Sequence, residues 1–175
     1  MAPSLSPSDA EVALRSLPRR FRTVFAAAGD DGPDEPADPD DVAARVGPDG
    51  HSALDHLVHA ARTIALLDRA LEQLVDESSP TLHPAVADEA GRDWSDAPLR
   101  SVDDGLAELT AAAEAMAARF AGVAADDWQR SAPVAGGASG GTAVGALDVL
   151  GDAVGTAVAR LKAAERTLRE VRSRG

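Results

Sequence analysis

Apolar residues recur at steps of three and four along four long segments of the chain, and no other feature constrains the fold as strongly. Because an α-helix turns every 3.6 residues, this spacing places the apolar side chains on one helical face. No segment shows the alternation that is typical of a half-buried strand. We therefore predict an all-α four-helix bundle that forms a single domain over residues 1–175. The predicted helices cover about residues 10–28, 52–75, 101–123 and 144–171.

Serine residues mark the expected beginnings of three of these helices. Ser52 lies three residues before Asp55, and Ser101 lies three residues before Asp104. In this arrangement the hydroxyl accepts a hydrogen bond from the later backbone N–H, and the carboxylate reaches back. Ser8 is a suitable N-cap for the first helix.

Proline and glycine interrupt the first and last helical patterns. Pro18 removes a backbone donor, so we expect a kink near residues 14–17 or a helix that starts after Ser8. Gly151 and Gly155 lie one turn apart in the last helix, where each costs roughly 1 kcal/mol relative to alanine. We expect a neighbouring backbone or a ligand to approach closely there.

Three segments lack the composition needed to bury a core. Residues 29–41 are rich in Asp, Glu and Pro, residues 135–141 are mostly Gly, Ala and Ser, and residues 1–7 show no helical pattern. We expect flexible segments at 1–7 and 29–41, and a flexible linker at 135–141. A long irregular stretch also joins the second and third helices, and such connections are often functional or cover the end of a bundle.

The composition disfavours several classes of function. A formal net charge of −12 opposes binding to nucleic acid and to anionic membranes. The chain has no cysteine, which excludes disulfides, thiolate metal sites and a cysteine nucleophile. No apolar segment reaches the length of a membrane span, and the N-terminus does not resemble a signal peptide. We therefore expect a cytoplasmic protein without nucleic-acid or membrane partners.

Three of the four histidines lie between His51 and His59. His56 and His59 are three residues apart, so a helix directs both imidazoles to a similar side. They could contribute to a zinc or nickel site, but a third protein ligand must then come from another helix. The alternative is that one histidine packs at the edge of the apolar face while the other is solvated.

Three stretches resemble the DinB-like superfamily, namely residues Leu14 to Arg22, Pro48 to His59, and the pair Asp127 and Trp128. Within that superfamily the chain is most similar to actinobacterial members related to mycothiol-dependent maleylpyruvate isomerases and thiol S-transferases. The resemblance covers residues 10–168. It implies a four-helix bundle in up-down-down-up order. It also implies a divalent metal held by one histidine of the second helix and two histidines of the fourth.

The resemblance places the second-helix metal ligand at His59 and the fourth-helix ligands at Thr156 and Arg160. Neither of the latter can replace histidine, because arginine stays protonated and a lone hydroxyl binds transition metals poorly. Asp152, one turn before Thr156, is the nearby carboxylate. In the family the metal is thought to activate a low-molecular-weight thiol, so the missing histidines remove the centre of that mechanism.

The favoured hypothesis is a non-catalytic or divergent member that binds a small molecule and needs no cofactor. His56, Thr156 and Arg160 are its candidate ligand-binding residues, and the fixed guanidinium suits a carboxylate or phosphate. Its partner would be a small anionic ligand or a low-molecular-weight thiol, and a homodimer is compatible with it.

Two other hypotheses stay open, and the sequence does not decide whether the chain is an enzyme. One is a mycothiol-type S-transferase or hydrolase with a rearranged zinc or nickel site. Its metal ligands would be His59 and Asp152, together with His56 or with His83 from the long connection. The other is a regulatory module whose acidic surface binds a basic protein.

Overall fold

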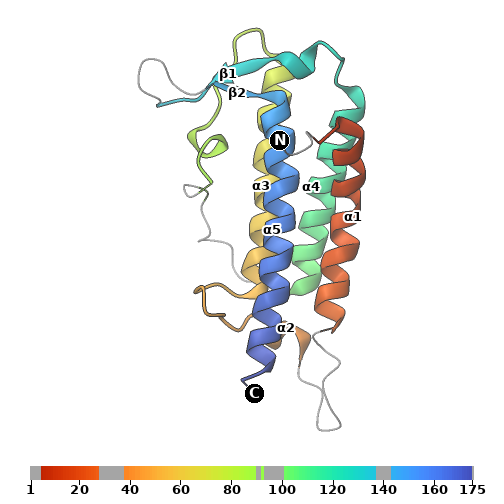
Figure 1. The fold of residues 1–175 in the computed structure, drawn as a ribbon, viewed down its shortest axis with the longest axis vertical. Helices are drawn as coiled ribbons and strands as arrows, with labels where there is room; N and C mark the ends of the chain where they lie inside the picture. The colour runs from red at the N-terminus through yellow and green to blue at the C-terminus, as the bar shows by residue number, and fades with distance from the viewer. Residues whose placement is uncertain (1–4, 28–37, 90–91, 93–100, 137–142, 175) are drawn as a thin grey trace.

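The computed structural model describes residues 5–27, 38–89, 92, 101–136 and 143–174, in which four long helices form a bundle (Figure 1). In this bundle α1 packs against α4 and α5, and α3 packs against the same two helices. The predicted all-α four-helix bundle is confirmed. The long helices are α1 (Pro7–Ala26), α3 (Ala53–Asp76), α4 (Val102–Gly122) and α5 (Ala146–Arg172).

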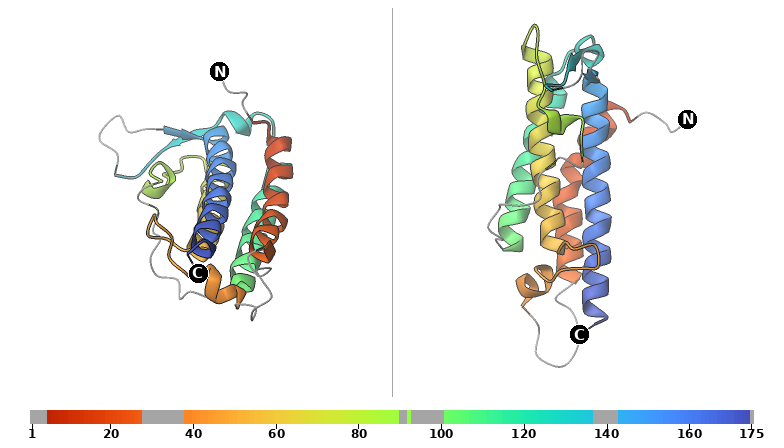
Figure 2. Two further views of the ribbon diagram at one scale, coloured as in Figure 1. Left: turned by 60° about the horizontal axis from the view of Figure 1, so that its bottom comes forward. Right: turned by 90° about the vertical axis from the view of Figure 1, so that its left-hand side faces the viewer.

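Helices α1 and α5 run in one direction along the bundle, and α3 and α4 run in the other (Figures 1 and 2). The chain therefore leaves α3 at one end of the bundle and enters α4 at the opposite end. A helix of 24 residues is roughly 36 Å long at 1.5 Å per residue. The connection between α3 and α4 is long because it must return over this distance. Its short helix η2 (Pro84–Val86) packs against α3.

The caps of α3 and α4 are those predicted. Ser52 Oγ accepts a hydrogen bond from the Asp55 backbone N–H at 3.0 Å, and Asp55 Oδ2 accepts from the Ser52 N–H at 2.7 Å. Ser101 Oγ accepts from the Asp104 N–H at 3.2 Å. These bonds satisfy backbone donors that have no partner inside the first helical turn.

Helix α1 begins earlier than predicted, with Ser6 rather than Ser8 as its N-cap. Pro7 occupies the first helical position, where a missing N–H costs nothing and the fixed φ favours a helix. The expected start after Ser8 is wrong, and α1 continues through Pro18. Pro18 is itself buried with Leu14 and Leu17, so packing offsets the lost hydrogen bond.

The expected close approach of a neighbouring backbone at Gly151 and Gly155 is not found in the described residues, and the alternative of a ligand there stays a prediction. A Cβ built at either position meets no atom of the described residues within 4 Å. Gly105 of α4 is the helical glycine that packs tightly, because a Cβ there would lie 2.8 Å from Leu57 Cδ2 on α3. The absence of a side chain at Gly105 therefore lets α3 and α4 approach each other.

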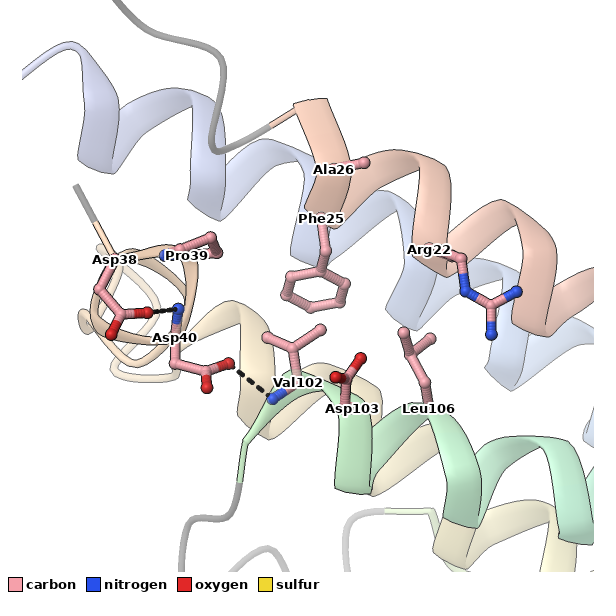
Figure 3. A pocket seen from close by; sticks show the side chains of 9 residues that line it. All are labelled: Arg22, Phe25, Ala26, Asp38, Pro39, Asp40, Val102, Asp103 and Leu106. Carbon is pink, nitrogen blue, oxygen red and sulfur yellow. Dashed lines mark hydrogen bonds between the residues drawn. The ribbon is translucent and has the colours of Figure 1, made fainter. Parts of the chain in front are cut away.

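A fifth helix lies inside the segment predicted to be flexible. Helix α2 (Pro39–Ala43) includes Pro39 to Asp41 of the predicted segment 29–41, and residues 29–37 lie outside the described residues. Asp40 Oδ1 accepts a hydrogen bond from the Val102 backbone N–H at 2.8 Å, which supplies a second cap for α4 (Figure 3). The acidic segment thus contributes a structural contact that its composition did not indicate.

Two short strands form a hairpin that the sequence pattern did not predict. Strand β1 (Ser131–Pro133) pairs antiparallel with β2 (Ala143–Gly145), with Ala132 opposite Val144. Three residues are too few to establish an alternating pattern. Ala135, the first residue of the predicted linker 135–141, donates its N–H to Leu82 O at 2.8 Å, and residues 137–141 lie outside the described residues. Of the predicted segment 1–7, residues 5–7 are described, and Pro7 is helical.

The interior is one apolar cluster with contributions from all four long helices. A bidentate ion pair supplements it between α3 and α4, where Arg119 Nε and Nη2 lie 2.7 and 3.1 Å from the two carboxylate oxygens of Asp68. Trp128 packs edge to face on Phe120, near the end of α4, at a ring-centroid distance of 5.7 Å. None of the described helices combines the length and the apolar character that a membrane crossing requires.

Candidate functional site

His56 and His59 lie on α3 and are 1% and 3% exposed. Burial, assisted by the positive charges of Arg160 and Arg92, lowers the pKa of His59 from 6.5 to about 4. Burial also lowers the pKa of His56, although the Asp49 carboxylate, 3.3 Å from its Nε2, acts in the opposite direction. The His59 imidazole is therefore neutral at pH 7. Both histidines are buried, so the expectation that one of them is solvated is wrong.

Arg92, from the connection between α3 and α4, inserts its guanidinium beside α5. Its side chain is 4% exposed. It donates from Nε to Ala85 O at 2.9 Å and from Nη2 to Val86 O at 3.0 Å. It also forms an ion pair with Asp152 through both Nη1 and Nη2. This buried cation therefore has a carboxylate and two carbonyl oxygens as partners, as a buried charge requires.

Asp152 receives a further hydrogen bond from the residue one turn later on α5. Thr156 Oγ1 donates to Asp152 Oδ1 at 2.8 Å. Thr156 is buried, whereas the Asp152 side chain is 33% exposed. The two residues considered as metal or anion ligands from the sequence thus bind each other, and Arg92 completes the group.

Arg160, one turn beyond Thr156 on α5, lies near both buried histidines. Its Nη2 is 2.7 Å from Glu89 Oε1 in the connection between α3 and α4. Its positive charge contributes to the lowered pKa of His56 and of His59. The structure therefore brings His59 and Arg160 together, and a carboxylate compensates the guanidinium.

The donor set does not fit a zinc or nickel ion. Within the described residues, no three His, Asp or Glu side chains are grouped to hold a metal. Two guanidinium groups, those of Arg92 and Arg160, lie close enough to His59 to affect its titration, and both would repel a divalent cation. Asp152 could bind a metal only after releasing Arg92, which would leave a buried cation without its counterion. Adding His56 or His83 to His59 and Asp152 does not complete a metal site in the described residues.

A cavity of about 230 Å³ opens beside His59. Two of its polar side chains come from the next turn of α3, and both lack partners in the described part of the chain. Arg62 forms no ion pair there, and Thr63 forms no hydrogen bond although it is only 3% exposed. We name this space the His59 cavity. Its lining residues are His59, Arg62, Thr63, Leu66, His83, Ala85 and Arg92.

His83 contributes a further polar group to the His59 cavity. Its Nδ1 accepts a hydrogen bond from the Ala85 backbone N–H at 3.2 Å, where His83 is the N-cap of η2. A neutral His83 consequently carries its proton on Nε2, which remains a donor. The cavity therefore combines three potential donors, from Arg62, Thr63 and His83, with the neutral imidazole of His59.

Sequence reasoning found His59 but missed Arg62, Thr63 and Arg92 as neighbours of the cavity. A signal existed for the first two, because residues three and four positions after His59 share its helical face. No comparable signal existed for Arg92, since its partner Asp152 is sixty residues away in the chain.

Other cavities lie away from the buried histidines. One of about 340 Å³ is bounded by the end of α1, by α2 and by the start of α4, and its wall includes Phe25, Asp40 and Leu106 (Figure 3). Asp40 is already engaged in capping α4. A third cavity, of about 250 Å³, touches the exposed side of Asp152.

Comparison with known proteins relates the chain to a known fold. No family model matches the sequence, and no curated protein matches it. Among solved structures, the chain is similar to YfiT from Bacillus subtilis, which is described as a probable metal-dependent hydrolase with an unusual four-helix bundle topology. The TM-score is 0.66 at 14% sequence identity, over 95% of this chain and 91% of YfiT. At this identity the likeness shows a shared fold.

Proposed function

We propose that this chain is a DinB-like helical bundle that binds a small anionic molecule in the His59 cavity and uses no metal ion there. The observation that carries the proposal is the ion pair between Arg92 and Asp152. Because the guanidinium occupies this carboxylate, Asp152 is not available to a metal ion. The fold shared with YfiT and the motifs around His59 support the DinB-like assignment.

The preference for an anion follows from the charges around the cavity. Arg62 and Arg92 are the charged residues of its lining. Asp152 neutralises Arg92, and Glu89 neutralises the nearby Arg160. His59 is neutral at pH 7 because its pKa is about 4. Arg62 therefore leaves the cavity with a net positive charge, and electrostatic attraction favours a negatively charged ligand.

The proposal is one of binding rather than catalysis. A metal-dependent hydrolase generates its nucleophile on a bound ion, and the donor set beside His59 does not fit such an ion. The hydroxyl of Thr156 donates to Asp152, but neither residue lines the His59 cavity, so this pair is not placed to attack a ligand bound there. We accordingly do not extend the hydrolase or thiol S-transferase chemistry to this chain.

The experiment that tests the proposal is an NMR titration of the full-length protein with ¹³C-labelled histidine at pH 7. The probes are inorganic phosphate and sodium isovalerate, each added separately. We expect at least one of them to shift the His59 and His83 imidazole signals saturably. His51, which does not line the cavity, serves as the internal control.

Bound anion should also raise the pKa of His59, because a nearby negative charge stabilises the imidazolium. Equal shifts of all four histidines would indicate a nonspecific salt effect and would contradict the proposal. The absence of any saturable shift at His59 and His83 with both probes would contradict it as well.

A further inference from the structure

We infer that the ligand of the His59 cavity is a monocarboxylate with a short apolar tail. This inference rests on the proposed function and specifies its ligand class. It follows from three properties of the lining: its net charge, the geometry of its donors, and the apolar side chains beside them.

The net charge selects a monoanion. Arg62 is the one cationic side chain of the lining that has no carboxylate partner in the described residues. Arg92 is already neutralised by Asp152. Arg62 is exposed at the mouth of the cavity and can pair with one negative charge, so the second charge of a dianion would find no uncompensated cation in this lining.

The donors of the lining match a carboxylate. A guanidinium can donate two parallel hydrogen bonds to the two carboxylate oxygens, and Arg62 supplies this group. The carboxylate lone pairs that remain can accept from the Thr63 hydroxyl and from His83 Nε2. Thr63 Oγ1 makes no hydrogen bond in the described residues and lines the cavity, so it is available to donate to a ligand there.

The rest of the lining favours a small apolar group. Leu66 and Ala85 line the same cavity as Arg62 and Thr63. A volume of about 230 Å³ lies below the range of roughly 300–1,000 Å³ that is usual for larger ligands. A short acyl chain would cover the two apolar side chains, whereas a phosphate group would leave them against a charged surface.

The test is isothermal titration calorimetry of the full-length protein at pH 7 with three named probes. Isovalerate carries the charge and the tail, isovaleramide keeps the shape without the charge, and inorganic phosphate keeps an anionic charge without the tail. We expect isovalerate to bind about tenfold or more tightly than either of the other probes. A difference of this size in affinity corresponds to the loss of one charged hydrogen bond.

Variants assign the binding to the named residues. Arg62→Ala should weaken isovalerate binding about tenfold or more, whereas Arg69→Ala should leave it unchanged. Arg69 is a matched control because it is exposed on the same helix and does not line the cavity. Thr63→Val should weaken binding about fivefold, and Thr63→Ser should restore most of the affinity. Circular dichroism confirms that each variant is folded.

The outcomes separate this inference from the proposed function. Phosphate binding more tightly than isovalerate, with loss in Arg62→Ala, would overturn the carboxylate assignment and leave the proposed anion site intact. Equal affinity for isovaleramide and isovalerate would overturn the role of the charge. If neither anion shifts the His59 and His83 signals in the NMR titration, the proposed function itself is contradicted, and the inference about the ligand class is contradicted with it.

Discussion

The guanidinium of Arg92 donates to both carboxylate oxygens of Asp152, and this contact joins the connection between α3 and α4 to helix α5. It also occupies a carboxylate that the sequence offered as a metal ligand, and the described residues hold no group of three side chains that could bind a metal ion. The Asp152 carboxylate therefore serves a cation of the protein itself.

This contact should appear as coupling in a double-mutant cycle. Asp152→Asn removes the counterion of a guanidinium whose side chain is 4% exposed. Breaking a fully buried pair costs roughly 3–5 kcal/mol, and since Asp152 is 33% exposed we expect a smaller loss, about 2 kcal/mol. Arg92→Met should cost a similar amount, and the double variant should cost about 1 kcal/mol less than the sum. Urea denaturation measures these values, and additive losses would show that the pair is not coupled.

The buried His59 should make stability depend on pH. Its pKa is about 4 in the folded protein and 6.5 in the unfolded chain, so the unfolded state binds more protons between these values. The free energy of unfolding therefore falls as the pH decreases from 6.5 to 4, by about 3 kcal/mol from this residue. Above pH 6.5 both states are neutral and His59 has no effect.

The contribution of His59 can be isolated from that of the carboxylates. His59→Gln removes the titrating group, and we expect its free energy of unfolding to fall less steeply over this pH range than that of the wild type. Parallel curves for the two proteins would mean that His59 is protonated in the folded state as readily as in the unfolded one.

Glycine substitutions should have opposite effects on α4 and α5. Gly105→Ala places a Cβ 2.8 Å from Leu57 Cδ2, and we expect it to lower the free energy of unfolding by about 1 kcal/mol despite the better helix propensity. Gly151→Ala and Gly155→Ala meet no described atom within 4 Å, so each should raise it by up to about 1 kcal/mol. Thermal and urea denaturation give the comparison. A destabilised Gly151→Ala or Gly155→Ala would indicate that something packs on this face in solution.

The helices could be predicted from the sequence because their signals are local. Ser52 and Asp55 are three residues apart, and their reciprocal hydrogen bonds need no tertiary partner. The start of α1 was misplaced because Ser6 and Ser8 are equally good caps by residue type, and Pro7 between them decides the matter.

The site was less predictable because its contacts are distant in the sequence. The spacing of His56 and His59 indicated one helical face, and the motifs around His59 pointed to α5 as its neighbour. The partners of Asp152 and Arg160 could not be found this way, because Arg92 and Glu89 come from a segment without a periodic pattern. The cavity itself depends on where that segment lies against α3.

The most direct test of a metal-free site is the metal content of the purified full-length protein, measured by elemental mass spectrometry after purification without chelators. We expect substoichiometric zinc, nickel and iron, with no change in His59→Gln. One equivalent of a transition metal per chain, lost in His59→Gln but kept in His51→Gln, would contradict the assignment of Arg92 as the partner that replaces a metal at Asp152.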